Sequence, residues 1–171
     1  MKTKLSLFLL PLAIMSCGPK SASLVSEKDQ EVIKVEIKEV VNIIIKGCKE
    51  ANFDMAMGPW LNSPDFVYIM NGSILSYQDV VNGMKPMFDA LSNQKFTMVS
   101  EKFSFIDKST VLYTTNCKFL MNYKDGHSVL ADPTAWFMLF RKIDNEWKAI
   151  YGVESYIEKT IADSTAKGGL N

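Results

Sequence analysis

The sequence predicts a single α+β domain in which helices pack on one face of a curved antiparallel sheet. Three observations lead to this prediction: a long amphipathic segment near the start of the chain, a short hairpin followed by another helical segment, and four long strands separated by turn residues. Helices come first and most strands come last, which is typical of this fold class. We assign the domain to residues 27–158, a length that suits one hydrophobic core.

Three segments are predicted to be helical. In residues 27–49, apolar side chains recur at steps of one to four and charged side chains fill the other face, as in an amphipathic helix. Asn52 is a suitable N-cap for a short second helix. Ser76 is a suitable cap for a third helix, residues 78–93, and Pro86 should bend it because proline lacks the amide proton of the helical ladder.

The predicted strands are bounded by turn residues. Asn71 and Gly72 form a tight turn between strands at 66–70 and 74–77. Turns rich in Asp, Asn, Gly and Ser separate the four longer strands, which lie at 95–106, 110–123, 128–143 and 147–157. The last residues are small and polar, so we expect 159–171 to be a disordered tail.

Composition excludes several kinds of partner. Hydrophobic residues make up 47% of the chain, which is enough for a core without disulfides or metal. The 19 Lys and Arg residues are balanced by 19 Asp and Glu residues, so we expect no nucleic-acid partner. The single histidine, His127, lies in a turn and no CxxC or HExxH motif occurs, so we expect no metal site and no cofactor.

Residues 1–16 have the features of a signal peptide. Two lysines precede an apolar run at 5–15, which is shorter than the roughly 20 residues of a membrane-spanning helix. The stretch Ile14–Cys17 resembles the bacterial lipobox, in which the cysteine thiol receives a diacylglycerol. We therefore expect lipid on Cys17 to anchor the protein to a membrane of the bacterial cell envelope. An ordinary cleaved signal peptide is the alternative.

Residues 17–26 are predicted to be the lipidated cysteine and a short flexible tether, because they are small and polar without apolar periodicity. No acidic cluster of the kind that marks surface-exported lipoproteins follows Cys17, which favours a domain that faces the periplasm.

Cys48 and Cys117 are the other cysteines. Cys48 ends the first helical segment and Cys117 lies in a strand among apolar neighbours, so we expect two buried free thiols. A disulfide between them stays open at this point, since two cysteines can pair in an oxidising compartment.

The order of these elements and three local segments resembles the superfamily of nuclear transport factor 2 (NTF2), including its SnoaL-like and ketosteroid-isomerase-like branches. The segments are KEANFDMAM, FVYIMNGSILSYQDVVNGM and LFRKIDNEWKAIYGVES, and together they extend over residues 30–157. The resemblance implies a cone-shaped sheet that curls around the helices and leaves a pocket at its wide end.

Alternate strand residues form the pocket walls in this superfamily. The resemblance places Trp147 and Ser155 on the inward face of the last strand, and strict alternation then places Tyr151 and Val153 there as well. Aromatic and methionine side chains elsewhere complete the expected ligand-binding pocket: Trp60, Tyr68, Met70, Trp136 and Met138. The same side chains could instead fill a solid core.

The strand at 128–143 is apolar on both faces, with Trp136 and Met138 on one and Phe137 and Leu139 on the other. A strand of this kind should be covered on both sides. Members of the superfamily commonly dimerise through the outer face of the sheet, so we expect a homodimer. Cover by the chain's own tail is the alternative.

The ketosteroid-isomerase branch uses an Asp at the end of the first strand and a Tyr in the first helix for proton transfer. The matching positions here are Met70 and Ile44, which cannot act as acid, base or donor. The remaining candidates for a catalytic carboxylate are Asp54, Asp65 and Asp132.

We therefore expect a lipid-anchored domain that binds a small apolar or aromatic molecule without catalysis. Two alternatives stay open. One is a SnoaL-like enzyme of isomerase, cyclase or hydratase type that uses a pocket aspartate, and the other is an envelope module that binds proteins.

Overall fold

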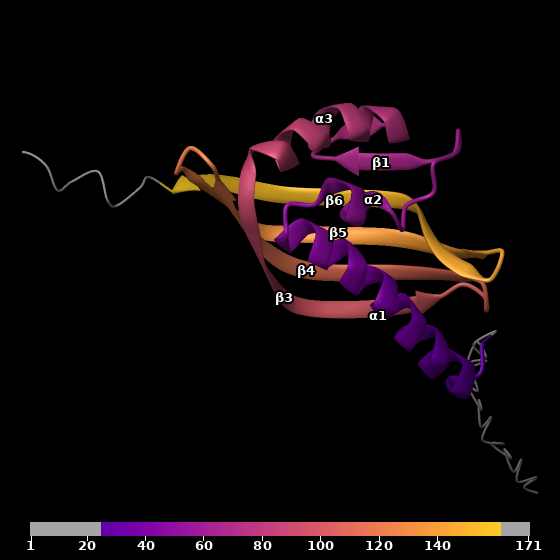
Figure 1. Ribbon diagram of the computed structural model, residues 1–171. Coiled ribbons are helices and arrows are strands. Elements are labelled where there is room, and N and C mark those ends of the chain that lie inside the picture. Colours follow the sequence, from indigo (N-terminus) through magenta and orange to yellow (C-terminus); the bar gives the residue numbers. More distant parts are fainter. Residues whose placement is uncertain (1–24, 162–171) are drawn as a thin grey trace, which may run out of the picture.

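The computed structural model describes residues 25–161, so the predicted signal peptide, Cys17 and most of the predicted tether lie outside the described residues. The elements follow in the order α1 (Glu27–Lys49), α2 (Phe53–Met57), β1 (Val67–Met70), β2 (Ser73–Leu75), α3 (Tyr77–Ala90), β3 (Leu91–Phe105), β4 (Thr110–Tyr123), β5 (Ser128–Ile143) and β6 (Glu146–Ile161). Helices followed by a curved sheet confirm the predicted α+β class (Figure 1). Within residues 25–161, no helix is long and apolar enough to cross a membrane.

The sheet has six strands in the order β2-β1-β6-β5-β4-β3. Strands β3 to β6 form the predicted antiparallel meander, but β1 pairs with β6 in the parallel direction. The expectation of an antiparallel sheet was therefore wrong at this one pair. The reason is that β1 and β6 are not consecutive in the chain. After β2, α3 carries the chain to the opposite edge of the sheet, and the meander from β3 returns so that β6 lies beside β1 and runs in the same direction.

Each helix begins at a polar cap. The side chains of Ser26 and Asn52 accept hydrogen bonds from backbone amides in the first turns of α1 and α2. Ser76 and Asp79 form a reciprocal capping box at the start of α3. The predicted caps at Asn52 and Ser76 are thus confirmed, although α3 ends at Ala90 and β3 follows it directly.

The core lies between α1, α2 and the inner face of the sheet. The apolar stripe of α1, including Ile37 and Ile44, is buried there. Gly47 allows α2 to approach closely, since a Cβ atom at this position would lie 2.3 Å from the backbone nitrogen of Ala56. Cys48 and Cys117 are free thiols, as expected, and burial raises the pKa of each to about 12.

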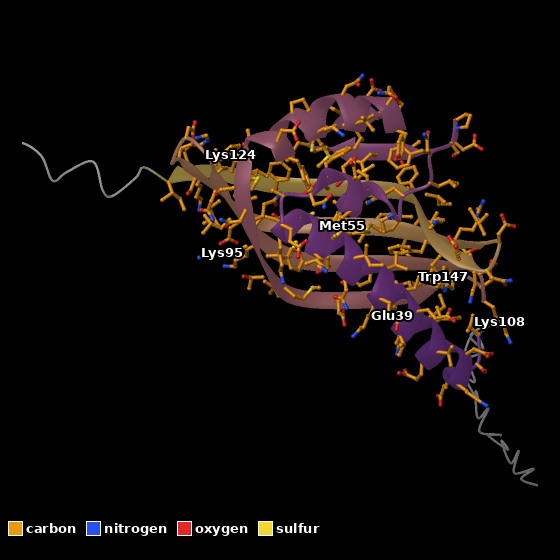
Figure 2. All side chains as sticks on the ribbon, in the orientation of Figure 1. Glu39, Met55, Lys95, Lys108, Lys124 and Trp147 are labelled. Atoms are coloured by element: carbon orange, nitrogen blue, oxygen red, sulfur yellow. The ribbon has the colours of Figure 1, made fainter. Side chains whose placement is uncertain are left out.

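The domain has two distinct ends. Figure 2 shows Lys108 near the start of α1, and Lys108 forms an ion pair with Asp29 of that helix. Lys95 and Lys124 lie at the opposite end of the sheet (Figure 2). The end of α1, at Cys48 and Lys49, points toward this second end (Figure 1).

The last strand differs from the prediction in two ways. It continues to Ile161, which pairs with Ser128, so residues 159–161 belong to the sheet and not to a disordered tail. It also contains a β-bulge: Leu139 pairs with Tyr151 whereas Phe140 pairs with Ala149, which leaves Ile150 as the extra residue. This bulge changes which side chains reach the interior.

Candidate functional site

A cavity of about 300 Å³ lies between α3, the end of α1 and the inner face of the sheet. Most of its wall is apolar and is formed by Cys48, Met70, Leu75, Val80, Met84, Met87, Phe88, Phe119, Met121 and Ala131. The polar or amphipathic side chains of its wall are Tyr68, Asp79, Gln94, Trp136, Glu154, Tyr156 and Glu158. A mostly apolar concavity with a few polar groups is the usual form of a small-molecule site.

The bulge at Ile150 brings Glu154 to this cavity. Trp147 and Ala149 face inward before the bulge, and Gly152 and Glu154 face inward after it. An extra residue in a strand shifts the alternation by one, so every side chain beyond it changes face. Tyr151 and Val153 are consequently on the outer face, and their predicted place in the pocket was wrong.

Gly152 provides the space for Tyr68. A Cβ atom on Gly152 would lie 2.5 Å from one carbon of the Tyr68 ring and 2.8 Å from the Trp60 ring. The absence of a side chain at Gly152 therefore lets the Tyr68 ring lie directly against β6. In this position the Tyr68 hydroxyl donates a hydrogen bond of 2.7 Å to a carboxylate oxygen of Glu154.

Burial is the main cause of the shifted pKa values of Glu154 and Tyr68. It raises the pKa of the Glu154 carboxyl, and the hydrogen bond from Tyr68 opposes that rise only in part. Burial and the nearby Glu154 charge also raise the pKa of the Tyr68 phenol. Tyr68 is therefore a neutral donor, and Glu154 takes up a proton more readily than an exposed glutamate does.

Trp136 lies next to the pair with its indole N–H unsatisfied. The side chain is 5% exposed, and Nε1 has no hydrogen-bond partner among residues 25–161. The indole also lowers the pKa of the Tyr68 phenol, against the larger effect of burial. A buried donor without an acceptor costs roughly 1–3 kcal/mol, so this part of the wall is not optimised for stability.

The charges on the cavity wall have one sign. Glu154 lies inside, and Asp79 and Glu158 are exposed at the rim. The Asp79 carboxylate is held in the capping box, where hydrogen bonds from Ser76 lower its pKa. Within the part of the chain that the structure describes, no Lys, Arg or His lines the cavity.

The other five predicted pocket residues divide into three groups. Tyr68, Met70 and Trp136 line the cavity. Trp60 lies behind it, in an edge-to-face contact with the Tyr68 ring at 5.4 Å between centroids. Met138 is completely buried in the core, so its expected place in the pocket was wrong.

The three aspartates considered as catalytic candidates all lie outside the cavity. Asp54 is 84% exposed and pairs with Lys85 at 3.4 Å, and Asp132 pairs with Lys118 at 2.9 Å. Asp65 is exposed in the segment before β1. Ile44 is buried in the core, and Met70 reaches the cavity without an ionisable group.

Sequence reasoning missed Glu154 and Gln94. The one local signal for Glu154 is Gly152, because a glycine inside a strand often marks a bulge or a close approach. Gln94 was placed between a helix and a strand, whereas β3 begins at Leu91 and turns the Gln94 side chain inward, where it is 6% exposed.

Comparison with known proteins identifies the fold. No protein-family model matches the chain, and no curated protein matches its sequence. Among solved structures, the chain is similar to a putative scytalone dehydratase from Novosphingobium aromaticivorans DSM 12444, with a TM-score of 0.69 and 9% identity over 80% of this chain and 91% of that one.

Two further structures agree. A hexachlorocyclohexane dehydrochlorinase, LinA type 2, matches with a TM-score of 0.65 and 13% identity over 81% of this chain and 95% of that one. An NTF2-like superfamily protein from Salmonella enterica serovar Typhimurium LT2 matches with a TM-score of 0.65 and 15% identity over 79% of this chain and 98% of that one. The chain therefore has the cone-shaped NTF2-like fold, as its sequence predicted.

Proposed function

We propose that this domain holds a small, largely apolar molecule in the cavity between α3 and the sheet, without converting it chemically. The observation that carries the proposal is the cavity itself, whose wall is apolar except for a few inward-facing polar groups. Its volume of about 300 Å³ is at the lower end of the range for ligand pockets, which suits a compact ligand.

Gly83 offers a direct way to test this function. It lines the cavity from α3, and a Cβ atom built on it meets nothing within 4 Å. A Gly83→Trp substitution should therefore block the cavity without a clash in the backbone. Asn82→Trp is the matched control, because Asn82 is an exposed neighbour on the same helix that does not line the cavity.

The assay is a fluorescence titration of the full chain with N-phenyl-1-naphthylamine, a neutral apolar probe whose emission rises in apolar surroundings. Saturable binding by wild type and Asn82→Trp, with at least a tenfold loss in Gly83→Trp, supports the proposal. Equal binding by all three proteins would show that the probe sits elsewhere and would count against a cavity function.

A second candidate function is acid–base catalysis of the isomerase, cyclase or hydratase type. It is favoured by the contact between Tyr68 and Glu154 inside the cavity, because a carboxyl with a raised pKa beside a neutral phenol can transfer a proton. In this second candidate function, Glu154 would be the catalytic carboxylate instead of Asp54, Asp65 or Asp132. The putative dehydratase and the dehydrochlorinase among the similar structures show that this fold accommodates such proteins.

Exchange of carbon-bound hydrogen separates the two candidates. Cyclohexanone and 2-cyclohexenone incubated with the protein in deuterium oxide would take up deuterium if a base in the cavity removed a proton. Uptake with wild type that is lost in Glu154→Gln supports catalysis, and uptake at the buffer rate in both supports binding alone.

The lipid anchor is a further proposal that rests on the signal-peptide features and on Cys17. A tether there would join the domain at the start of α1, whereas the cavity borders Cys48, roughly 30 Å further along that helix. The cavity would then face away from the membrane, toward the periplasm. Labelling with a fatty-acid analogue in wild type but not in Cys17→Ala would support the anchor.

The outer face of the sheet supports the proposed homodimer, and it would equally suit an envelope interaction module. Phe137 pairs with Val153, and Leu139 pairs with Tyr151, which gathers four apolar side chains on that face. Because the bulge turns Tyr151 and Val153 outward, this patch is larger than the sequence suggested. A patch of this kind on a soluble domain commonly marks a protein contact.

A further inference from the structure

We propose that the ligand of the cavity is an apolar molecule that carries a protonated amine, and that this amine pairs with Glu154. The inference rests on the proposed binding function and names the chemical class of the ligand. Four observations on the cavity wall support it: a carboxylate without a countercharge, a wall charge of a single sign, aromatic rings around the space and an unpartnered amide.

The Glu154 carboxylate lacks a cationic partner. Tyr68 donates one hydrogen bond to it, and among residues 25–161 no Lys, Arg or His forms an ion pair with it. A partly buried charge without a countercharge is unfavourable, and proteins usually pair such groups. Burial of this charge without a cationic partner also raises the pKa of Glu154.

The second carboxylate oxygen of Glu154 is available to a ligand. It has no hydrogen-bond partner among the described residues. In that part of the chain, Trp136 Nε1 is the only fully buried side-chain nitrogen or oxygen without a partner, so this oxygen of Glu154 is not fully buried. The free oxygen is therefore in contact with the open space of the cavity. A ligand that donates a hydrogen bond there would complete the coordination of the carboxylate.

The electrostatic potential of the cavity favours a cation. Asp79 and Glu158 at the rim add negative charge to that of Glu154, and no described basic residue on the wall offsets it. A cleft lined by charge of one sign concentrates its field on the ligand. A carboxylate or phosphate on the ligand would be repelled and would also lose its hydration.

Two further features distinguish an amine from a neutral donor. The rings of Tyr68, Phe88, Phe119, Trp136 and Tyr156 surround the space and can attract a cation through their faces. Gln94 is 6% exposed, lines the cavity and makes no side-chain hydrogen bond with any residue in 25–161, so its amide is available to a further polar group of the ligand. An ammonium group has three N–H donors, whereas an alcohol has one O–H.

Three probes that share one ring system test the inference: 1-naphthylmethylamine, 1-naphthylmethanol and 1-naphthoic acid. Isothermal titration calorimetry with the full chain at pH 7.5 gives a Kd for each. We expect the amine to bind at least tenfold more tightly than the alcohol, and the acid to bind more weakly than either. Gly83→Trp should reduce the binding of both the amine and the alcohol.

Two variants identify the group responsible. Glu154→Gln should remove the tenfold preference and leave the Kd of the alcohol within about threefold. Tyr68→Phe keeps the carboxylate but removes the hydroxyl that lowers its pKa, so the preference should persist and shift to higher pH. Near-ultraviolet circular dichroism checks that both variants are folded. Equal binding of amine and alcohol by wild type, or a preference that survives Glu154→Gln, would overturn the inference and leave the binding function intact. Failure of all three probes to bind wild type would count against both.

Discussion

The Tyr68 hydroxyl donates a 2.7 Å hydrogen bond to Glu154 across the parallel pair of strands β1 and β6. Tyr68 belongs to the short strand β1, and Glu154 lies on β6 just beyond its bulge. The contact joins segments that are 86 residues apart in the sequence. The bulge that turns Glu154 inward also sets which side chains of β6 lie on the outer face of the sheet.

Gly152→Ala should destabilise the domain, because the new Cβ atom would lie 2.5 Å from the Tyr68 ring. Overpacking of this kind typically lowers the free energy of unfolding by about 1–3 kcal/mol. Gly83→Ala is the control: nothing lies within 4 Å of its Cβ position, and alanine favours a helix. Urea denaturation of both variants measures the difference, and equal stability would mean that Tyr68 does not press on Gly152.

Tyr68→Phe should remove one hydrogen bond to a carboxylate while keeping the aromatic contact with Trp60. We expect a loss of about 1–2 kcal/mol in the free energy of unfolding. The pKa of Glu154 should rise further, because the hydroxyl that lowers it is gone. Nuclear magnetic resonance titration of the carboxyl carbon reports this directly, and a fall in that pKa would contradict the assigned contact.

Glu154→Gln should stabilise the domain at alkaline pH. Because burial raises the pKa of Glu154, the native state holds this proton more tightly than the unfolded chain does. The protonated Glu154 carboxyl therefore contributes to stability at acid pH, and this contribution is lost as the pH rises through the raised pKa of Glu154. Glutamine keeps an acceptor for Tyr68 without the charge.

The expected gain at pH 8 is about 1 kcal/mol, or about 2–4 °C in Tm for a domain of this size, and it should vanish at pH 4. Thermal unfolding of wild type and variant at both pH values makes the comparison. Glu158→Gln serves as the control, because Glu158 is exposed at the rim and should change Tm very little. A variant that is less stable than wild type at pH 8 would show that the charge of Glu154 is compensated in the native state.

Phe137→Lys should weaken the proposed homodimer, because it places a charge among Leu139, Tyr151 and Val153 on the outer face. Size-exclusion chromatography with light scattering should give a dimer mass for wild type and a monomer mass for the variant. Gln78→Lys is a control on the exposed surface of α3. A monomeric wild type at high concentration would remove the dimer from the account.

Local signals allowed most of the elements to be predicted. The apolar stripe of α1, the caps at Asn52 and Ser76 and the turn at Asn71 and Gly72 each depend on neighbouring residues, so each is visible in the sequence. The parallel pairing of β1 with β6 depends on contacts between distant segments, and no local pattern encodes it.

The candidate site was less predictable because one bulge decides it. Strict alternation from Trp147 placed Tyr151 and Val153 inside and Glu154 outside, and the extra residue at Ile150 reverses all three. Tyr68, Met70 and Trp136 line the cavity, and their positions lie outside the segment of β6 that the bulge reverses. The sequence pattern therefore predicted apolar residues of the cavity wall but not the acidic group, Glu154.

The methionine methyl groups offer the most direct test of whether the cavity between α3 and the sheet is the binding site. Met70, Met84, Met87 and Met121 line the cavity, whereas Met55 on α2 and Met98 on β3 do not. Met55 is labelled in Figure 2.

The measurement is a titration of the full chain, labelled with ¹³C at its methionine methyl groups, with 1-naphthylmethylamine. We predict saturable shifts of the four cavity methyl signals with a single Kd, and unchanged signals from Met55 and Met98. Shifts confined to Met55 or Met98, or no shift at any ligand concentration, would contradict the account.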